Sequence, residues 1–288
     1  MEIERTLDVL DGNICCNHRI ISYKGNFFHN HNGYELFLLL NGNINYYIET
    51  VGMQLERGNL VMIKPYDFHT REVVKGNTYE RIVINIKDSY MTKLSSDKTN
   101  VADCFFSNFP GKGNLLKLNE QQITEYIIIA QRLSQELESN EYGSDILVDS
   151  YIKQILVMVN RISKNQNSEG LNNIMPSLVS NTIAYIEQNI TEEITLDILS
   201  DCFHHNGTYI SRCFKNITGI SLQQYIIQKR ITLAKKYLFE GCSPQDACFL
   251  SGFNDYSNFS RTFKKQTGLS PREFQNQNNK KGLRKSYL

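Results

Sequence analysis

Residues 211–221 read SRCFKNITGIS, and residues 260–270 read SRTFKKQTGLS, 49 positions further along the chain. Seven of the eleven positions are identical. The correspondence continues beyond the quoted stretch, because Tyr225 matches Phe274 at the same offset. Two copies are too few for a solenoid, so the repeat indicates a small helical module that occurs twice.

Each copy contains the local signals of two short helices joined by a tight turn. In the first copy Thr195 and Asn206 can each cap a helix, and Gly219 follows where a left-handed residue is favoured. The matching signals of the second copy are Ser243-Pro244 for the first cap, Gly252 for the turn, Asn254 or Asp255 for the second cap and Gly268 for the end. This order predicts two helix-turn-helix units, at about residues 195–219 and 243–268.

The second helix of each unit is expected to bury one apolar face and leave a polar face outward. In the first copy the inward set is Tyr209, Ile210, Cys213 and Phe214. Small hydroxyl side chains allow close approach to base edges, arginine binds guanine with two hydrogen bonds, and lysine neutralises phosphate. The candidate DNA-binding residues are therefore Thr208, Ser211, Arg212, Lys215, Ser257, Ser260, Arg261 and Lys264.

Two further features of the repeat bear on DNA binding. The Thr-Gly-x-Ser segments at 218–221 and 267–270 are expected to offer backbone N–H groups and hydroxyls to phosphate. The alternative is that all these polar residues are the solvent-facing side of a helical hairpin. The same outward chemistry in two copies favours DNA over that alternative.

The charge of the chain is divided between its two halves. From Met175 onward there are 14 Lys/Arg and 9 Asp/Glu, a net charge of +5, against 17 and 21, a net charge of −4, before it. A basic back half joined to an acidic front half suggests that the back half meets a polyanion.

Residues 176–275 resemble the DNA-binding domain of the AraC/XylS family of bacterial transcription regulators, above all over 252–274, GFNDYSNFSRTFKKQTGLSPREF. Residues 230–238, RITLAKKYL, resemble the helix that joins the two modules of that family. The resemblance implies reading helices in successive major-groove turns, about 34 Å apart. It also implies that six of the candidate residues contact bases. These are Thr208, Ser211, Arg212, Ser257, Ser260 and Arg261. His204-His205 and Pro244 depart from the family pattern.

The front half reads as β structure followed by helices. Regularly spaced glycines punctuate strand-like segments at 34–40, 43–50, 59–64 and 80–86, as in an antiparallel barrel. Helical periodicity then covers 119–139 and 145–163, which either pack on their own barrel or form a subunit interface. Residues 163–173 are polar and are expected to be a linker.

Three histidines and a glutamate form a pattern in the front half. The segment from His29 through His31 and Glu35 to Gly42 resembles the first cupin motif, and the segment that ends at His69 resembles the second. In metal cupins such residues hold Mn, Fe, Ni or Zn. In the AraC family a similar stretch occurs in domains that bind small organic effectors, and we expect effector binding, without a cofactor, rather than metal or a purely structural role.

We therefore expect an α+β chain of two domains. Residues 1–163 would be a cupin-like β-barrel with two following helices, for effector binding and dimerisation, and 164–175 a linker. Residues 176–275 would be an all-α DNA-binding domain of two helix-turn-helix units joined by a linker helix, followed by a basic tail, 276–288.

The expected function is transcription regulation, and activation in particular, without enzymatic activity. Its partners would be promoter DNA, a small effector such as a carbohydrate, RNA polymerase and a second copy of the chain. Two alternatives are a metal-dependent cupin enzyme fused to a DNA-binding domain and a nonspecific nucleic-acid binder. Seven scattered cysteines without a C-x-x-C pair, and no signal-peptide or membrane-span pattern, indicate the cytoplasm.

Overall fold

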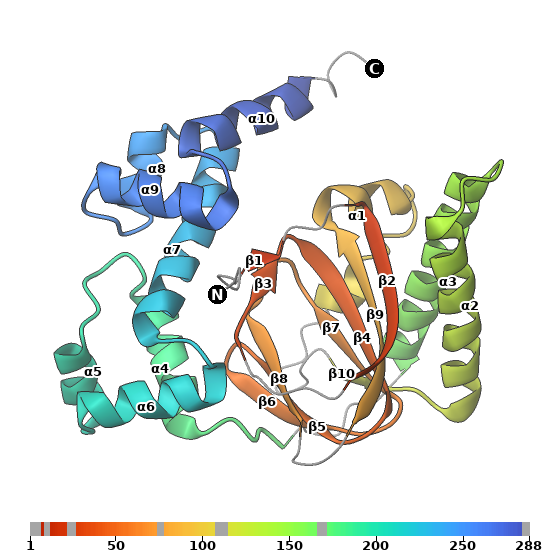
Figure 1. Cartoon of the computed structure of the whole chain (residues 1–288), viewed down its shortest axis with the longest axis horizontal. Helices are drawn as coiled ribbons and strands as arrows, with labels where there is room; N and C mark the ends of the chain where they lie inside the picture. Colours follow the sequence, from red (N-terminus) through yellow and green to blue (C-terminus); the bar gives the residue numbers. More distant parts are fainter. Residues whose placement is uncertain are drawn as a thin grey trace. The chain divides into compact units, whose positions relative to one another are not determined.

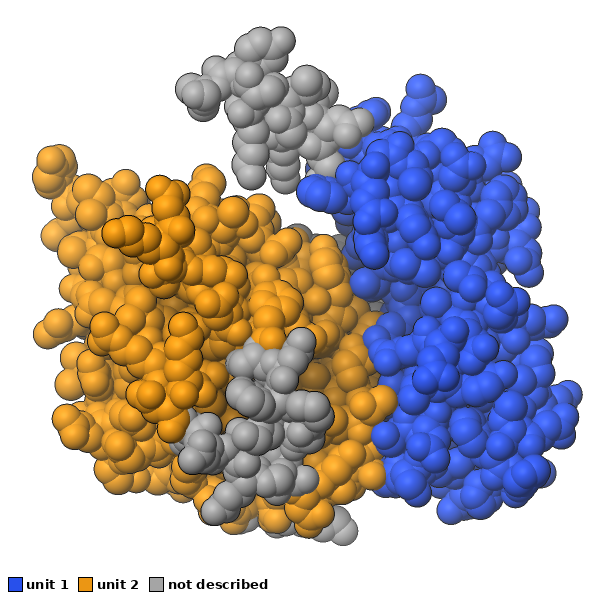
Figure 2. Space-filling model, turned by 180° about the vertical axis from the view of Figure 1, so that it is seen from behind, with its two compact units in different colours: residues 1–7, 176–288 blue, residues 8–175 orange. Residues whose placement is uncertain are grey.

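The computed structural model describes residues 7–8, 12–21, 27–73, 78–106, 115–165 and 172–283. The chain divides into two compact units, Asp8–Met175 and Pro176–Leu288, the second of which also includes Met1–Leu7 (Figures 1 and 2). The expected α+β organisation is confirmed, with a strand-rich front half and a helical back half. Among the described residues, no helix combines the length and apolarity needed to cross a bilayer.

The front unit is built on two antiparallel sheets that face each other (Figure 1). The strands are β1 (Leu7–Asp8), β2 (Ile14–Ile21), β3 (Asn30–His31), β4 (Gly33–Asn41), β5 (Ile44–Ile48), β6 (Val51–Leu55), β7 (Asn59–Ile63), β8 (His69–Val73), β9 (Tyr79–Lys87) and β10 (Leu115–Lys117). In the described residues one sheet has the order β10-β7-β4-β9-β2 and the other has the order β6-β5-β8.

Strand β4 is buried on both faces because it is the middle strand of the larger sheet. Phe37 and Leu39 point into the core between the two sheets, whereas Leu36 and Leu38 join the core on the other side. This alternation follows from the two-residue period of a strand. It explains why the segment reads as a continuous apolar run rather than as an alternating one.

Helices cover the outer face of the larger sheet. They are α1 (Asp88–Leu94), the 3-10 turn η1 (Asp103–Phe106), α2 (Glu120–Glu138) and α3 (Ser144–Asn165). Asn119 begins α2 with a reciprocal capping box to Gln122. The apolar stripes of α2 and α3, including Leu133 and Leu156, pack into the core behind the sheet. Of the two expected roles for these helices, packing on their own barrel is therefore observed.

The back unit is entirely helical in its described part. Its helices are α4 (Ser177–Gln188), α5 (Leu196–Phe203), α6 (Gly207–Thr218), α7 (Leu222–Phe239), α8 (Pro244–Leu250), α9 (Tyr256–Thr267) and α10 (Pro271–Leu283). The expected caps are present: Asn206 accepts a hydrogen bond from the N–H of Thr208, and Asp255 rather than Asn254 caps α9. Gly219 and Gly268 end α6 and α9 with φ of 72° and 79°.

Two expected boundaries differ from the structure. Helix α3 continues to Asn165, and the end of the segment expected as a linker, 164–175, is fixed to the barrel. Gly52 donates its N–H to the side chain of Asn173 at 2.8 Å and accepts from the N–H of Ile174 at 3.0 Å. The expected basic tail, 276–288, is helical as far as Leu283, because α10 begins at Pro271. Residues 166–171 and 284–288 lie outside the described residues.

Gly252 and Gly268, the two glycines of the second module with positive φ, allow a test of their backbone conformation. Gly268→Ala should lower the free energy of unfolding by about 1–2 kcal/mol, because a Cβ there meets no neighbour but requires a positive φ. Gly252→Ala should cost more, because its Cβ would also lie 2.8 Å from the carbonyl oxygen of Ile190. Urea unfolding followed by circular dichroism measures both, and equal losses would contradict this placement.

Candidate nucleic-acid interface and barrel site

The two reading helices, α6 and α9, bury equivalent faces. Ile210 and Phe214 of α6 are buried, as are Phe259 and Phe263 at the equivalent positions of α9. The structure leaves the candidate DNA-binding residues on the other side of each helix. Ser211 and Ser260 are half-buried, and the exposed ones are Thr208, Arg212, Lys215, Ser257, Arg261 and Lys264.

The arginines of the two helices are held differently. The guanidinium of Arg212 lies over the ring of Tyr209, 5.6 Å from its centroid. Arg261 instead donates from Nε to the carbonyl oxygen of Ser257 at 3.3 Å. Tyr209 was expected to face inward, but 44% of its surface is exposed. The expectation was wrong because Tyr209 lies at the edge of the apolar stripe, where an amphipathic ring can turn outward.

The turn into α6 differs from that into α9. His204 ends α5 in the left-handed conformation, with φ of 54°. A side chain is disfavoured in this conformation, which explains why a small residue is usual there. His205 packs beside Tyr209, with ring centroids 5.7 Å apart. The first module thus presents an aromatic and imidazole cluster where the second has Asn254 and Asn258.

The hydroxyls of the Thr-Gly-x-Ser segments take part in the hydrogen bonding of the fold. Thr218 and Thr267 each donate to the carbonyl of the residue four positions back, at 2.8 Å in both copies. Ser221 and Ser270 accept from backbone N–H groups three residues ahead, of Gln224 and Glu273, and so cap the next helices. The hydroxyls of Thr218 and Thr267 donate within the domain, whereas those of Ser221 and Ser270 only accept there, so phosphate binding by the serine O–H groups stays a prediction.

The joining helix α7 also holds the two modules together. Arg230 donates from Nε to the carbonyl of Ile190 at 2.9 Å and from Nη2 to that of Glu192 at 2.6 Å. Gly252 lies against the same place, because a Cβ on it would approach Arg230 and Thr191 to 2.9 Å. The turn of the second module thus contacts the segment before the first, which limits independent movement of the two reading helices.

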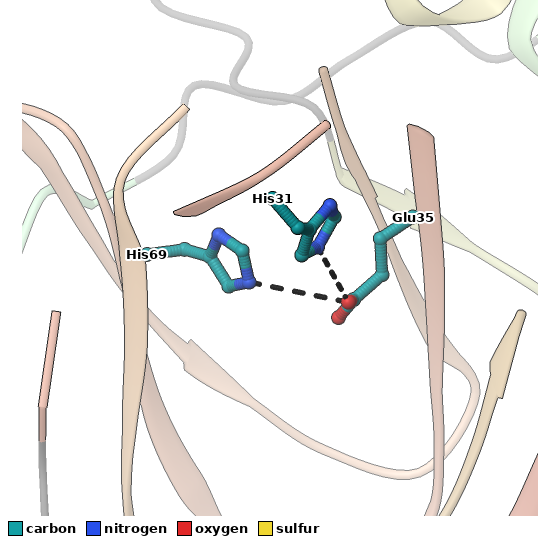
Figure 3. A group of neighbouring side chains, drawn as sticks. All are labelled: His31, Glu35 and His69. Atoms are coloured by element: carbon teal, nitrogen blue, oxygen red, sulfur yellow. Dashed lines mark hydrogen bonds and ion pairs between the residues drawn. The ribbon is translucent and has the colours of Figure 1, made fainter. Parts of the chain in front are cut away.

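The second candidate site lies inside the barrel and is shown in Figure 3. His31, Glu35 and His69 come from β3, β4 and β8, and each offers a ligand atom within 4.8 Å of the other two. They are almost completely shielded from solvent, at 4%, 5% and 0% exposure. His29 stands beside this group, its ring centroid 4.3 Å from that of His69. The structure therefore brings together three of the four expected residues.

Backbone carbonyls determine which ring nitrogens face the centre of this group. Nδ1 of His31 lies 2.9 Å from the carbonyl oxygen of Gly33, and Nδ1 of His69 lies 3.0 Å from that of Asp67. A carbonyl oxygen only accepts, so each Nδ1 carries the proton and donates it. Nε2 of each ring then faces the carboxylate of Glu35.

The atoms at the centre of the group are incompletely satisfied. Nε2 of His31 lies 3.0 Å from Oε2 of Glu35. Since Nδ1 already carries a proton, this contact is a hydrogen bond when Nε2 carries a second one. Nε2 of His69 is 3.9 Å from the same oxygen and has no hydrogen-bond partner among the described residues. A buried lone pair in this situation is unfavourable unless a proton or a cation binds it.

The charges of the group follow from burial and from mutual contact. Burial alone would raise the pKa of Glu35, but the hydrogen bond from His31 and the charges of the nearby histidines hold it well below its usual range. Burial lowers the pKa of His69 well below its usual value, and the charge of His29 lowers it further. The site thus places an ionised carboxylate beside Nε2 of His31 and near Nε2 of His69, which has no hydrogen-bond partner among the described residues.

This donor set fits a divalent first-row metal ion. Metal-bound histidines almost always donate their second ring N–H to a carbonyl or carboxylate, as His31 and His69 do here. Two imidazoles and one carboxylate leave open positions on such an ion. The partnerless Nε2 of His69 is the observation that favours a cation.

Comparison with known proteins concerns mainly the back unit. Residues 199–277 match a family described as "Helix-turn-helix domain". The chain is 40% identical over 91 residues to the "Bifunctional transcriptional activator/DNA repair enzyme AdaA" of Bacillus subtilis (strain 168), covering 31% of this chain and 43% of that protein. It is 22% identical over 246 residues to the "HTH-type transcriptional activator RhaS" of Enterobacter sp. (strain 638), covering 85% and 86%.

The matches to two regulators of Bacillus subtilis cover less than half of each of those proteins. The chain spans 43% of AdaA and 40% of an uncharacterised regulator of the same organism, YobQ. A crystal structure of unsaturated fatty acid bound ToxT from Vibrio cholerae covers 91% of this chain and 94% of its own, with 15% identity and a TM-score of 0.39, too low to define a common arrangement. Within the back unit the repeat, the caps and the family match agree. Residues 199–277 therefore form a helix-turn-helix DNA-binding domain of the AraC family.

Proposed function

We propose that this chain is a sequence-specific transcription regulator whose barrel unit binds a small effector. The observation that carries the proposal is the repeated outward chemistry of α6 and α9. Ser211, Arg212 and Lys215 recur as Ser260, Arg261 and Lys264 on helices that bury apolar residues at equivalent positions of the opposite face. A helical hairpin needs no such repetition for stability, whereas a protein that reads two segments of one duplex does.

The reading mechanism assigns different tasks to these side chains. Arg212 and Arg261 would each bind a guanine edge, and the nearby hydroxyl residues would allow the helices to approach the bases. Lys215 and Lys264 would contact phosphate and add affinity without sequence preference. The stacking of Arg212 on Tyr209 fixes its direction before DNA binds, so less side-chain entropy is lost on binding.

Regulation requires that the effector favour one state of the protein over another. The effector would bind inside the barrel, near His29, His31, Glu35 and His69. Activation through RNA polymerase, dimerisation and a cytoplasmic location stay predictions. RhaS is named as a transcriptional activator, which supports activation, whereas AdaA is named both as an activator and as a DNA repair enzyme and is matched over 43% of its length.

We further propose that His31, Glu35 and His69 hold a divalent transition-metal ion in the regulator. When bound, such an ion would act as a Lewis acid with positions open to an oxygen ligand. The backbone carbonyls of Gly33 and Asp67 would orient the two rings, and burial would keep water away. The same geometry favours the metal-dependent enzyme as the second candidate, although the named relatives are regulators.

The DNA-binding proposal is tested by single substitutions. Arg261→Ala should weaken binding to the selected site by about 1–3 kcal/mol and relax preference at one base position, because the guanine contact is lost. Lys264→Ala should weaken binding to all sequences alike and reduce the salt dependence. In vitro site selection followed by titration of fluorescent duplexes measures both effects.

Arg132→Ala is the matched control, since Arg132 is exposed on α2 of the barrel unit. It should leave DNA binding unchanged. Wild-type protein that shows no preference for any selected duplex over scrambled DNA at physiological salt would contradict the proposal and support a nonspecific binder.

The metal proposal is tested by elemental analysis of protein purified without chelator. Wild type should retain about one first-row ion per chain, and Glu35→Gln and His69→Gln should lose at least ten-fold in affinity, because a ligand is removed. His29→Gln is the control and should keep the ion, since His29 lies outside the group. Protein without metal that also gives no Co²⁺ absorption bands on titration would refute a metal site.

A further inference from the structure

The inner face of the barrel carries two arginines in addition to the histidine group. On β9, Arg81 pairs with Leu39 of β4, two positions from the pair Phe37–Val83. Phe37, Leu39 and Val83 all belong to the core between the sheets. Because side chains alternate along a strand, Arg81 shares this inner face.

Arg71 reaches the same interior from the other sheet. It pairs on β8 with Tyr46 of β5, which is fully buried in the core between the sheets. Its Nε donates to the hydroxyl of Tyr79 at 2.6 Å, and Tyr79 is also buried in that core. Glu72, the next residue, points to the opposite face, where Asn45 and Tyr47 donate to it.

Arg81 is poorly satisfied where it stands. Its guanidinium lies over the ring of Phe37, 5.6 Å from the centroid, and its Nε has no hydrogen-bond partner within the described part of the chain. Burial lowers the pKa of Arg81, and the charge of nearby Arg71 lowers it further. The buried side-chain oxygen of Asn85, four residues further along the same face of β9, is also without a described partner.

Charged groups of both signs lie near Arg81. Among the described residues, Glu35 supplies a carboxylate to this interior, and its Oε2 lies 3.0 Å from Nε2 of His31. Arg19 of β2 stands directly across from Arg81, and like charges in that position destabilise a sheet. Burying a guanidinium beside another cation and a phenylalanine costs stability unless an anion joins it.

We propose that the effector is a small organic acid whose carboxylate binds Arg81 and Arg71 inside the barrel. The inference rests on the proposed function and names the chemical class of the effector. A guanidinium matches a carboxylate with two parallel hydrogen bonds, which a neutral sugar does not supply. Phe37, Leu39 and Val83 provide an apolar wall for the carbon part of the acid.

The test is thermal unfolding of the full chain with matched pairs of acid and neutral compounds at equal ionic strength. Sodium acetate is compared with sodium chloride at 100 mM, sodium galacturonate with galactose and sodium gluconate with glucitol at 10 mM. Acetate should raise Tm, and at least one of the larger acids should raise it more. The expected shifts are about 2–5 °C, because a ligand that binds the native state stabilises it. The neutral partners and chloride should leave Tm unchanged.

Arg81→Met is the decisive variant, since methionine keeps much of the side-chain volume without the charge. It should abolish the response to every acid while its own Tm without ligand is unchanged or higher, because an unpaired buried cation has been removed. Arg132→Met, on the exposed surface of α2, is the matched control and should respond as wild type does.

Two results would overturn the inference. One is that no acid raises Tm more than its neutral partner or chloride does. The other is that Arg81→Met responds to the acids as wild type does. Binding of the same preparations to the selected duplex is measured in parallel. Selective DNA binding without an acid response would refute the acidic effector and leave the regulator standing, whereas loss of selective DNA binding would refute the regulator.

Discussion

Each reading helix is fixed by an aromatic contact between its buried phenylalanine and the helix that follows. Phe214 meets Tyr225 with ring centroids 5.4 Å apart, and Phe263 meets Phe274 at 5.5 Å, both nearly edge to face. Such contacts combine a large buried area with a preferred geometry. Because they set the rotation of each helix about its axis, they decide that Arg212 and Arg261 point outward. DNA reading by the back unit depends on this constraint.

The core of the barrel unit contains polar and charged side chains as well as apolar ones. Apolar residues fill most of the space between its sheets, but a carboxylate and two imidazoles are buried there as well, and the half-buried Arg71 and Arg81 face the same interior. Each polar group without a partner lowers stability, and His69 and Arg81 both have such an atom within the described residues. A chain selected for stability alone would replace these groups with apolar ones. Their presence supports a binding site more strongly than any single distance does.

Local signals in the sequence predicted the back unit well, because its helices begin and end on side chains that bond to nearby backbone. Asn206, Asp255 and Gly268 are read directly from their neighbours in the sequence. The outward turn of Tyr209 was not predictable, since it depends on packing. The pairing of Arg81 with Leu39 was equally hidden, because strand register brings together residues far apart in the chain. The histidine motif was visible in the sequence, but its carbonyl partners were not.

The two modules differ in packing at the start of their reading helices and agree in several outward-facing residues. Gly207 lets α6 approach α5, since a Cβ on it would lie 3.0 Å from that of Leu196, whereas the equivalent residue of α9 is the exposed Tyr256. Exposed side chains away from such contacts usually change stability by less than about 0.5 kcal/mol. Packing therefore explains the difference between Gly207 and Tyr256 but not the identity of the exposed arginine and lysine positions. A common partner for both faces explains that identity, and a duplex that presents successive major-groove segments is such a partner.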